Sequence, residues 1–251
     1  MRPIPNREKL ILSGLYLSKY DLTALERLGY EGFVEAFNVI GGALGAKPAS
    51  IKNYRDEFDP HFSNRRRGWH KRPMRLYCRD VFEEYKDLDF ESFTNLIGSF
   101  FGLDENAWGN FDPDVEPDRG ASAFAKRLIT GLAAERYFEA AHPGISEFQG
   151  YAVENTTRFG CGYDFRLRNA PHQNDFLAVE VKGLTDQTGT VSMTAREYEA
   201  ATTLRHRFFL FVVRNFRESP FHEIYADPAS GVLDFKRTER IVTQVSWMAT
   251  V

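Results

Sequence analysis

The chain has 251 residues, 43% hydrophobic and 14% aromatic, which supplies ample material for a packed core and excludes a disordered chain. A net charge of -3 excludes a basic surface over the whole molecule, so any nucleic-acid interface would have to be local. The two cysteines are far apart in the sequence and lack C-x-x-C spacing, which excludes a zinc ribbon or a disulfide framework. No stretch approaches the roughly 20 apolar residues of a membrane span, and the first ten residues lack the apolar region of a signal peptide. We therefore expect a soluble, cytoplasmic protein with no membrane partner.

The first part of the chain, residues 1–103, is predicted to be a mostly helical domain. Apolar residues recur at spacings of three and four over 8–21, 23–45 and 89–102. Residues 104–119 lose this periodicity, are rich in Pro and Gly, and carry six acids against one base. We interpret this segment as an acidic linker between two domains.

Residues 120–251 are predicted to form a second domain in which strands follow a helix. Helical spacing covers 122–141, and Thr194 and Glu197 have the S/T-x-x-E spacing of a capping box that starts another helix. Residues 222–247 contain an Asp-Pro and a Ser-Gly turn and suggest two or three further strands. The remaining strands are predicted at 163–169, 176–183 and 207–216. The order indicates a mixed sheet flanked by helices, an α+β or α/β architecture.

The strand at 176–183, "FLAVEVKG", has one apolar face and one face that changes character. Side chains alternate in a strand, so Leu177, Val179 and Val181 share a face. The other face begins apolar and ends with Glu180 and Lys182. A strand that runs out into a polar pocket has this pattern, although an exposed Glu180–Lys182 ion pair on a sheet surface is the alternative.

Asp164 is the predicted partner of this charged end. If the strands at 163–169 and 176–183 form an antiparallel hairpin, Asp164 lies opposite Glu180 or Lys182. Two converging carboxylates repel unless a cation lies between them, and hard oxygen ligands suit Mg²⁺ or Mn²⁺. Asp164 and Glu180 are therefore the candidate metal ligands, with the Val181 carbonyl as a third. Lys182 would orient water beside a phosphoryl group, which is the chemistry of phosphodiester hydrolysis.

A third acid is expected on the helix at 122–141. Glu135 and Glu139 lie one turn apart on the same face, and either would reach the site. We favour Glu135, because Ala133 and Ala134 beside it leave room for close packing onto the sheet.

Together these residues resemble the PD-(D/E)XK nuclease superfamily, and within it the NO VEIN C-terminal type. The resemblance covers about residues 120–225 and rests on "GCGYD", "VEVKG", the Thr-x-x-Glu helix and the strand "FFLFVVRN". It implies a restriction-endonuclease-like core, a mixed central sheet in the order αβββαβ. It also implies metal ligation by Asp164 and Glu180, a catalytic role for Lys182 and a supporting acid at Glu135. The superfamily's proline is absent before Asp164, where Tyr163 stands.

The first domain contains a local basic segment. Residues 36–58 resemble a helix-turn-helix, whose second helix would enter a DNA groove. Across 45–79 ten bases face three acids. A docking surface for a partner or for the second domain is the alternative. The candidate DNA-contacting residues are Lys47, Lys52, Asn53, Arg55, Arg65, Arg66, Arg67, Trp69, His70, Lys71 and Arg72.

The sequence therefore predicts a Mg²⁺-dependent DNA endonuclease, with double-stranded DNA as the expected partner and a homodimer as the expected assembly. A restriction or mobile-element defence enzyme needs this combination of a DNA-reading part and a nuclease. Two alternatives stay open: a non-catalytic nucleic-acid-binding or adaptor protein on the same scaffold, and an RNase.

Overall fold

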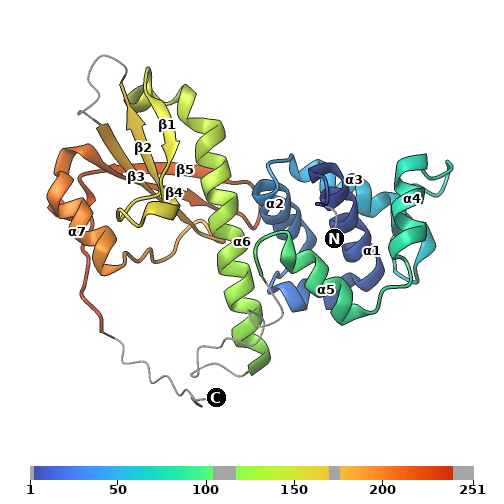
Figure 1. Ribbon diagram of the computed structural model, residues 1–251. Coiled ribbons are helices and arrows are strands. Elements are labelled where there is room, and N and C mark those ends of the chain that lie inside the picture. Colours follow the sequence, from blue (N-terminus) through green and yellow to red (C-terminus); the bar gives the residue numbers. More distant parts are fainter. Residues whose placement is uncertain (1–2, 104–116, 170–175, 240–251) are drawn as a thin grey trace, which may run out of the picture.

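The computed structural model describes residues 3–103, 117–169 and 176–239, and Figure 1 shows their arrangement. A group of helices from the first hundred residues lies beside a β-sheet that has helices on both of its faces. The predicted mixed α and β architecture is confirmed. Across these residues, no helix combines the length and the apolar character that a membrane crossing requires.

The first part is helical, as predicted. The predicted helix pair at 36–58 is present as α2 and α3, joined by residues 44–47, and α3 packs against α1 and α2. α1 is interrupted at Asp21, whose φ of 50° and ψ of -122° are not helical. The helices are α1 (Asn6–Leu28), α2 (Phe33–Ala43), α3 (Pro48–Phe58), α4 (Leu76–Tyr85) and α5 (Phe90–Ser99).

The second part begins with the long helix α6 (Pro117–Ala141). The predicted linker, 104–119, lies outside the described residues except for its last three, which belong to α6. After α6 come five strands, and α7 (Ala195–Leu204) connects β3 to β4. The strands are β1 (Ala152–Asn155), β2 (Phe165–Arg168), β3 (Phe176–Gly183), β4 (Phe208–Arg214) and β5 (Phe221–Ala226).

The sheet is mixed and has the order β1-β2-β3-β4-β5. The pairs β1–β2, β2–β3 and β4–β5 are antiparallel, whereas β3 and β4 are parallel. The parallel pair needs a crossover connection, and α7 provides it. The element order α6-β1-β2-β3-α7-β4 is therefore helix, three strands, helix, strand.

Helices cover both faces of the sheet, which explains the continuous apolar run in β4. Its first six residues, 208–213, are all buried. Phe209 and Phe211 belong to the core shared with α6, while Phe208 packs with Ala178 and Ala201 on the α7 side. A strand buried on both faces has no polar alternation, as the sequence predicted. In Figure 1, α6 and α7 lie on opposite sides of the sheet.

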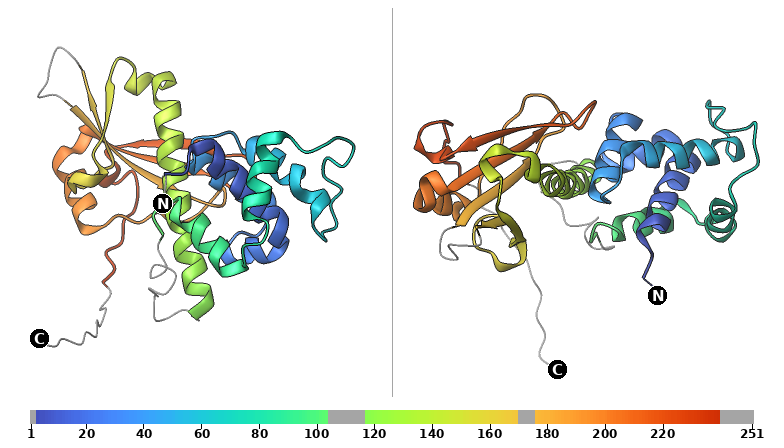
Figure 2. Two further views of the ribbon diagram at one scale, coloured as in Figure 1. Left: turned by 45° about the vertical axis from the view of Figure 1, so that its right-hand side comes forward. Right: turned by 90° about the horizontal axis from the view of Figure 1, so that it is seen from above.

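The two parts share one hydrophobic core across α6. α2 packs along α6, and a Cβ added to Gly42 would lie 3.2 Å from the Cβ of Ala133. Asn38 on α2 donates hydrogen bonds to the carbonyls of Phe216 (2.8 Å) and Glu218 (3.0 Å), just after β4. Figure 2 shows α6 end-on between the sheet and the N-terminal helices.

The C-terminal part differs from the prediction of two or three further strands. Only β5 forms within 222–239, because Pro228 begins a short 3-10 turn and residues 232–239 pair with no strand. The rest of the predicted strands, 240–247, lies outside the described residues. The short 3-10 helices of the described residues are η1 (Asp59–His61), η2 (His142–Gly144), η3 (Ser146–Phe148), η4 (Thr157–Phe159), η5 (Arg205–Arg207) and η6 (Pro228–Ser230).

Candidate active site

The pairing of β2 with β3 brings Asp164 to Glu180. Phe165 is opposite Val179, so the preceding residue, Asp164, falls opposite Glu180. The Asp164 N–H donates to the Val179 carbonyl (3.1 Å), and its side-chain Oδ2 accepts from the Val181 N–H (2.9 Å). The hairpin predicted from the sequence is confirmed. Asp164, the residue just before the start of β2, is held by these hydrogen bonds against the backbone of β3.

Two glycines allow other elements to approach this edge closely. Gly162 has a φ of +84°, and a Cβ there would lie 2.6 Å from the Arg196 carbonyl oxygen on α7. Gly183, which ends β3, has the Thr130 carbonyl of α6 at 2.9 Å from the position of a Cβ. Real Cβ atoms do not tolerate such distances, so both helices depend on glycine to pack at the site.

Lys182 lies between two carboxylates. Its Nζ donates to Glu180 Oε1 at 2.5 Å and to Glu197 Oε2 at 2.9 Å. Glu180 is only 3% exposed. The alternative of an exposed surface ion pair is therefore wrong: the pair forms between the buried Glu180 and a lysine whose side chain is 23% exposed, where charges are costly unless they are compensated.

Glu197 was not predicted as a site residue. Its side chain accepts from the Thr194 N–H at 2.8 Å, which completes the capping box at the start of α7, and it also accepts from Lys182. The capping-box spacing was visible in the sequence and was a sufficient reason for a glutamate at this position. The contact of Glu197 with Lys182 depends on the tertiary packing of α7 beside β3, for which the sequence has no signal.

The acids of the cluster would carry more negative charge than Lys182 can compensate if all of them were ionised. Burial, then the nearby Asp164 carboxylate, raises the pKa of Glu180 to about 9. Burial also raises the pKa of Asp164, against the opposing effect of its hydrogen bond from Val181. Burial opposes the charge on Lys182, but Glu180 and Glu197 outweigh it and raise the lysine pKa. At neutral pH Lys182 is thus charged, Glu197 is ionised and Glu180 retains a proton.

Glu135 adjoins this cluster from α6. Burial, then the charges of Asp164 and Glu139, raises the pKa of Glu135 to about 7. Glu139 instead forms an ion pair with Arg136 at 2.7 Å. The preference for Glu135 over Glu139 as the third acid stays a prediction: the charge of Asp164 acts on Glu135, whereas Glu139 is paired with Arg136.

The donor set suits a hard divalent cation. Asp164 and Glu180 are crowded carboxylates that their protein surroundings do not fully neutralise. The Val181 carbonyl faces the same edge of β3 as its N–H, because both groups of one strand residue point the same way. Within residues 3–103, 117–169 and 176–239, no group of three or more His, Cys, Asp or Glu side chains could hold a metal. A bound Mg²⁺ would thus depend on two carboxylates, one carbonyl and water, which is a common set for this ion.

We expect the raised pKa of Glu180 to make the metal-free protein less stable as the pH rises. The folded state keeps a proton that the unfolded chain loses above pH 4.5, so the free energy of unfolding falls between pH 4.5 and about 9. Between pH 6 and 8 the wild type should lose about 1 kcal/mol more per pH unit than Glu180→Gln. Urea unfolding in EDTA measures this, and parallel pH curves for the two proteins would contradict it.

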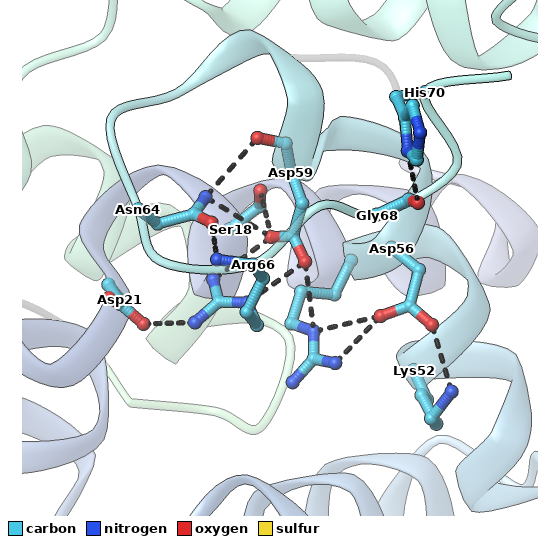
Figure 3. A network of polar contacts seen from close by, with 10 residues as sticks. Ser18, Asp21, Lys52, Asp56, Asp59, Asn64, Arg66, Gly68 and His70 are labelled. Carbon is cyan, nitrogen blue, oxygen red and sulfur yellow. Dashed lines mark hydrogen bonds and ion pairs between the residues drawn. The ribbon is translucent and has the colours of Figure 1, made fainter.

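Part of the predicted DNA-contacting segment forms an internal ion-pair network, drawn in Figure 3. Arg66 donates to both carboxylate oxygens of Asp59 at 2.9 Å and also binds Asp21 at the interruption of α1. Asp59 is buried and additionally accepts from Ser18 at 2.8 Å. Arg55, itself buried, pairs with Asp56 at 2.7 Å. Arg55 and Arg66 thus hold α1, α3 and the following loop together.

Arg72, a further predicted residue, and Arg75, another base of the segment 45–79, also have internal partners. Arg72 contacts the buried Glu57 at 2.7 Å and lies over the Trp69 ring, with its guanidinium carbon 4.4 Å from the ring centre. Arg75 binds Glu57 as well, at 2.8 Å. The basic count of this segment therefore overstates the charge that it offers to a ligand.

Eight of the predicted residues are exposed, including Arg72, which also contacts Glu57, whereas Trp69 is half-buried. Lys52 pairs with Asp56 at 2.9 Å, but its side chain stays 54% exposed, and His70 contacts the Gly68 carbonyl. These residues surround the start of α3 and the loop before α4. The exposed members of the predicted set are Lys47, Lys52, Asn53, Arg65, Arg67, His70, Lys71 and Arg72.

A model of a known protein family matches the part of the chain that forms the sheet and the candidate active site. No curated protein and no solved structure matches the chain. The matched family span starts on α6 and ends with the last residue of β5, so it includes Glu135, Asp164, Glu180, Lys182 and Glu197. Residues 134–226 match the model of the family described as Protein NO VEIN, C-terminal.

Proposed function

We propose that the protein is a metal-dependent nuclease that hydrolyses DNA phosphodiester bonds. The observation that carries the proposal is the arrangement of Lys182 between Glu180 and Glu197, with Asp164 opposite Glu180. Glu180 is buried and the Lys182 side chain is 23% exposed, and ionisable groups that are withdrawn from water in this way favour a functional role. The helix, three strands, helix, strand order is the one expected for a restriction-endonuclease-like core, which forms part of the proposal.

Asp164, Glu180 and the Val181 carbonyl would hold a Mg²⁺ or Mn²⁺ ion. When bound, that ion would polarise the phosphoryl group and favour ionisation of water. Lys182 would orient the attacking water and stabilise the charge that develops on the phosphate. Glu197 fixes the position of the lysine ammonium, and Glu135, with a pKa of about 7, can take up or release a proton near neutral pH.

The exposed bases around α3 would bind the DNA backbone. Arg65 and Arg67 have solvent-exposed side chains, as has Lys71, and cations of this kind release counterions when they neutralise phosphates. One site per chain cuts one strand, so cleavage of both strands by a homodimer is part of the proposal.

A cleavage assay on several substrates tests the proposal. The 251-residue chain is incubated with supercoiled, linear and single-stranded DNA and with RNA, in Mg²⁺, in Mn²⁺ and in EDTA. We expect cleavage of DNA in either metal and none in EDTA. Cleavage confined to RNA would replace the proposal with an RNase. Binding of nucleic acid without cleavage of any substrate would support a non-catalytic binding protein instead.

A further inference from the structure

A cleft of about 760 Å³ opens beside the candidate active site. One wall is the face of α6 that carries Leu132, Glu135 and Glu139. The opposite wall is the end of β1 and the turn η4, with Asn155, Arg158 and Phe159. Glu135 is the predicted site residue that lines this cleft, so the cleft lies on the α6 side of the candidate active site.

Phe159 presents its ring to solvent at this cleft. Its 72% exposure is the highest among the large hydrophobic side chains of the described residues. Burying a phenylalanine side chain stabilises a protein by about 1.5–3 kcal/mol, and the exposed Phe159 contributes little of this stabilisation. An isolated exposed apolar residue needs no explanation, but one that lines a cleft together with an acid of the candidate active site is a candidate contact for a ligand.

Hydrogen bonds hold the loop that carries Phe159 in place. The Phe159 N–H donates to the Thr156 carbonyl (2.9 Å), and the Thr156 N–H donates to the Asp164 carbonyl (2.7 Å). The buried Thr156 hydroxyl donates to the Tyr163 carbonyl (3.1 Å), and Arg196 of α7 donates to the Gly160 carbonyl (3.1 Å). The ring is therefore exposed on a fixed loop, and the same loop positions Asp164.

Arg158 adds a positive charge next to this ring. It is exposed and makes no ion pair with any residue that the structure describes, whereas Arg136 across the cleft is paired with Glu139. An aromatic ring beside an unpaired guanidinium matches two features of a nucleotide, a base with a flat face and a phosphate with negative charge.

We infer that this cleft binds an unpaired nucleobase of the strand to be cut, with Phe159 stacking on the base and Arg158 contacting an adjacent phosphate. A base inside a duplex has both faces covered by its neighbours, so a protein ring that stacks on one needs a single strand, a bubble or a flipped base. The inference rests on the proposed nuclease function and specifies its substrate as DNA that is unpaired at the cleft.

Binding measurements without cleavage test the inference. The probes are fluorescent oligonucleotides in EDTA and low salt: one single-stranded, one duplex with a central bubble and one blunt duplex, each with 2-aminopurine at its centre. Phe159→Ala should weaken binding of the single strand and the bubble about tenfold or more and abolish 2-aminopurine quenching. Phe159→Trp should retain both properties. Leu22→Ala, at a similarly exposed apolar residue on α1, is the matched control and should bind as the wild type does.

Three results would overturn the inference: wild-type affinity in Phe159→Ala, equal losses in Phe159→Ala and Leu22→Ala, or no binding of any probe by the wild type. A parallel assay with Mn²⁺ separates this inference from the nuclease proposal. Binding that depends on Phe159 without cleavage would keep the cleft assignment and remove the nuclease. Cleavage of DNA together with binding that does not depend on Phe159 would keep the nuclease proposal and remove the cleft assignment.

Discussion

Replacing Lys182 with methionine should lower the rate of DNA cleavage by about 10³-fold, because it removes the cation that contacts Glu180 and Glu197 in the candidate active site. The methionine keeps most of the side-chain volume, so the loss is that of the ammonium group at the end of β3. Glu180 and Glu197 lose their shared partner at the same time. Single-turnover cleavage of an end-labelled DNA measures the effect.

The matched control for this change is Lys236→Met, which removes a lysine from an exposed position after β5. It should cleave at the wild-type rate. Circular dichroism and urea unfolding establish that the Lys182 variant is folded, so that a lost fold is not mistaken for lost chemistry. Cleavage by Lys182→Met at the wild-type rate would show that the cluster has no catalytic role.

Replacing Arg66 with alanine should lower the free energy of unfolding by about 2–3 kcal/mol. The substitution leaves the buried Asp59 carboxylate without its bidentate partner and removes the contact to Asp21 on α1. We place the loss below the largest values for buried pairs because Arg55 and Ser18 still contact Asp59. Urea unfolding monitored by tryptophan fluorescence gives the change.

Arg65 and Arg67, on either side in the sequence, are the controls. Both are exposed, and their alanine variants should stay within about 0.5 kcal/mol of the wild type. If the exposed bases bind DNA, charge reversal at Arg65 and Arg67 should instead weaken DNA binding and flatten its dependence on salt. Equal stability of all three alanine variants would contradict the structural role of Arg66.

Much of the candidate site followed from alternation and register in the sequence. The change from apolar to charged along one face of β3 predicted a strand that ends in a polar pocket. A short loop between two strands predicted the hairpin that sets Asp164 opposite Glu180. These features are local, and local patterns are what a single sequence records best.

Other features depend on contacts between distant segments. β1 was not predicted, because its four residues, "AVEN", are too short for an alternation to be recognised. Glu197 already had a complete explanation as a capping residue, so its contact with Lys182 was hidden. The basic segment was interpreted by its charge count, although Arg55, Arg66 and Arg72 pair with acids of α1 and α3 or the turn after α3. Only tertiary packing separates an arginine that holds a fold together from one that meets a ligand.

The dependence of cleavage rate on Mn²⁺ concentration, compared between the wild type and Asp164→Asn, tests the central claim most directly. Asp164→Asn keeps the shape of the side chain and an oxygen for the Val181 N–H while removing the charge. We expect the wild type to cleave DNA only when the metal is present and the rate to saturate with Mn²⁺. The variant should need at least about tenfold more metal and cleave far more slowly. Identical curves for the two proteins, or cleavage in EDTA, would contradict the assignment of this cluster as a metal-dependent active site.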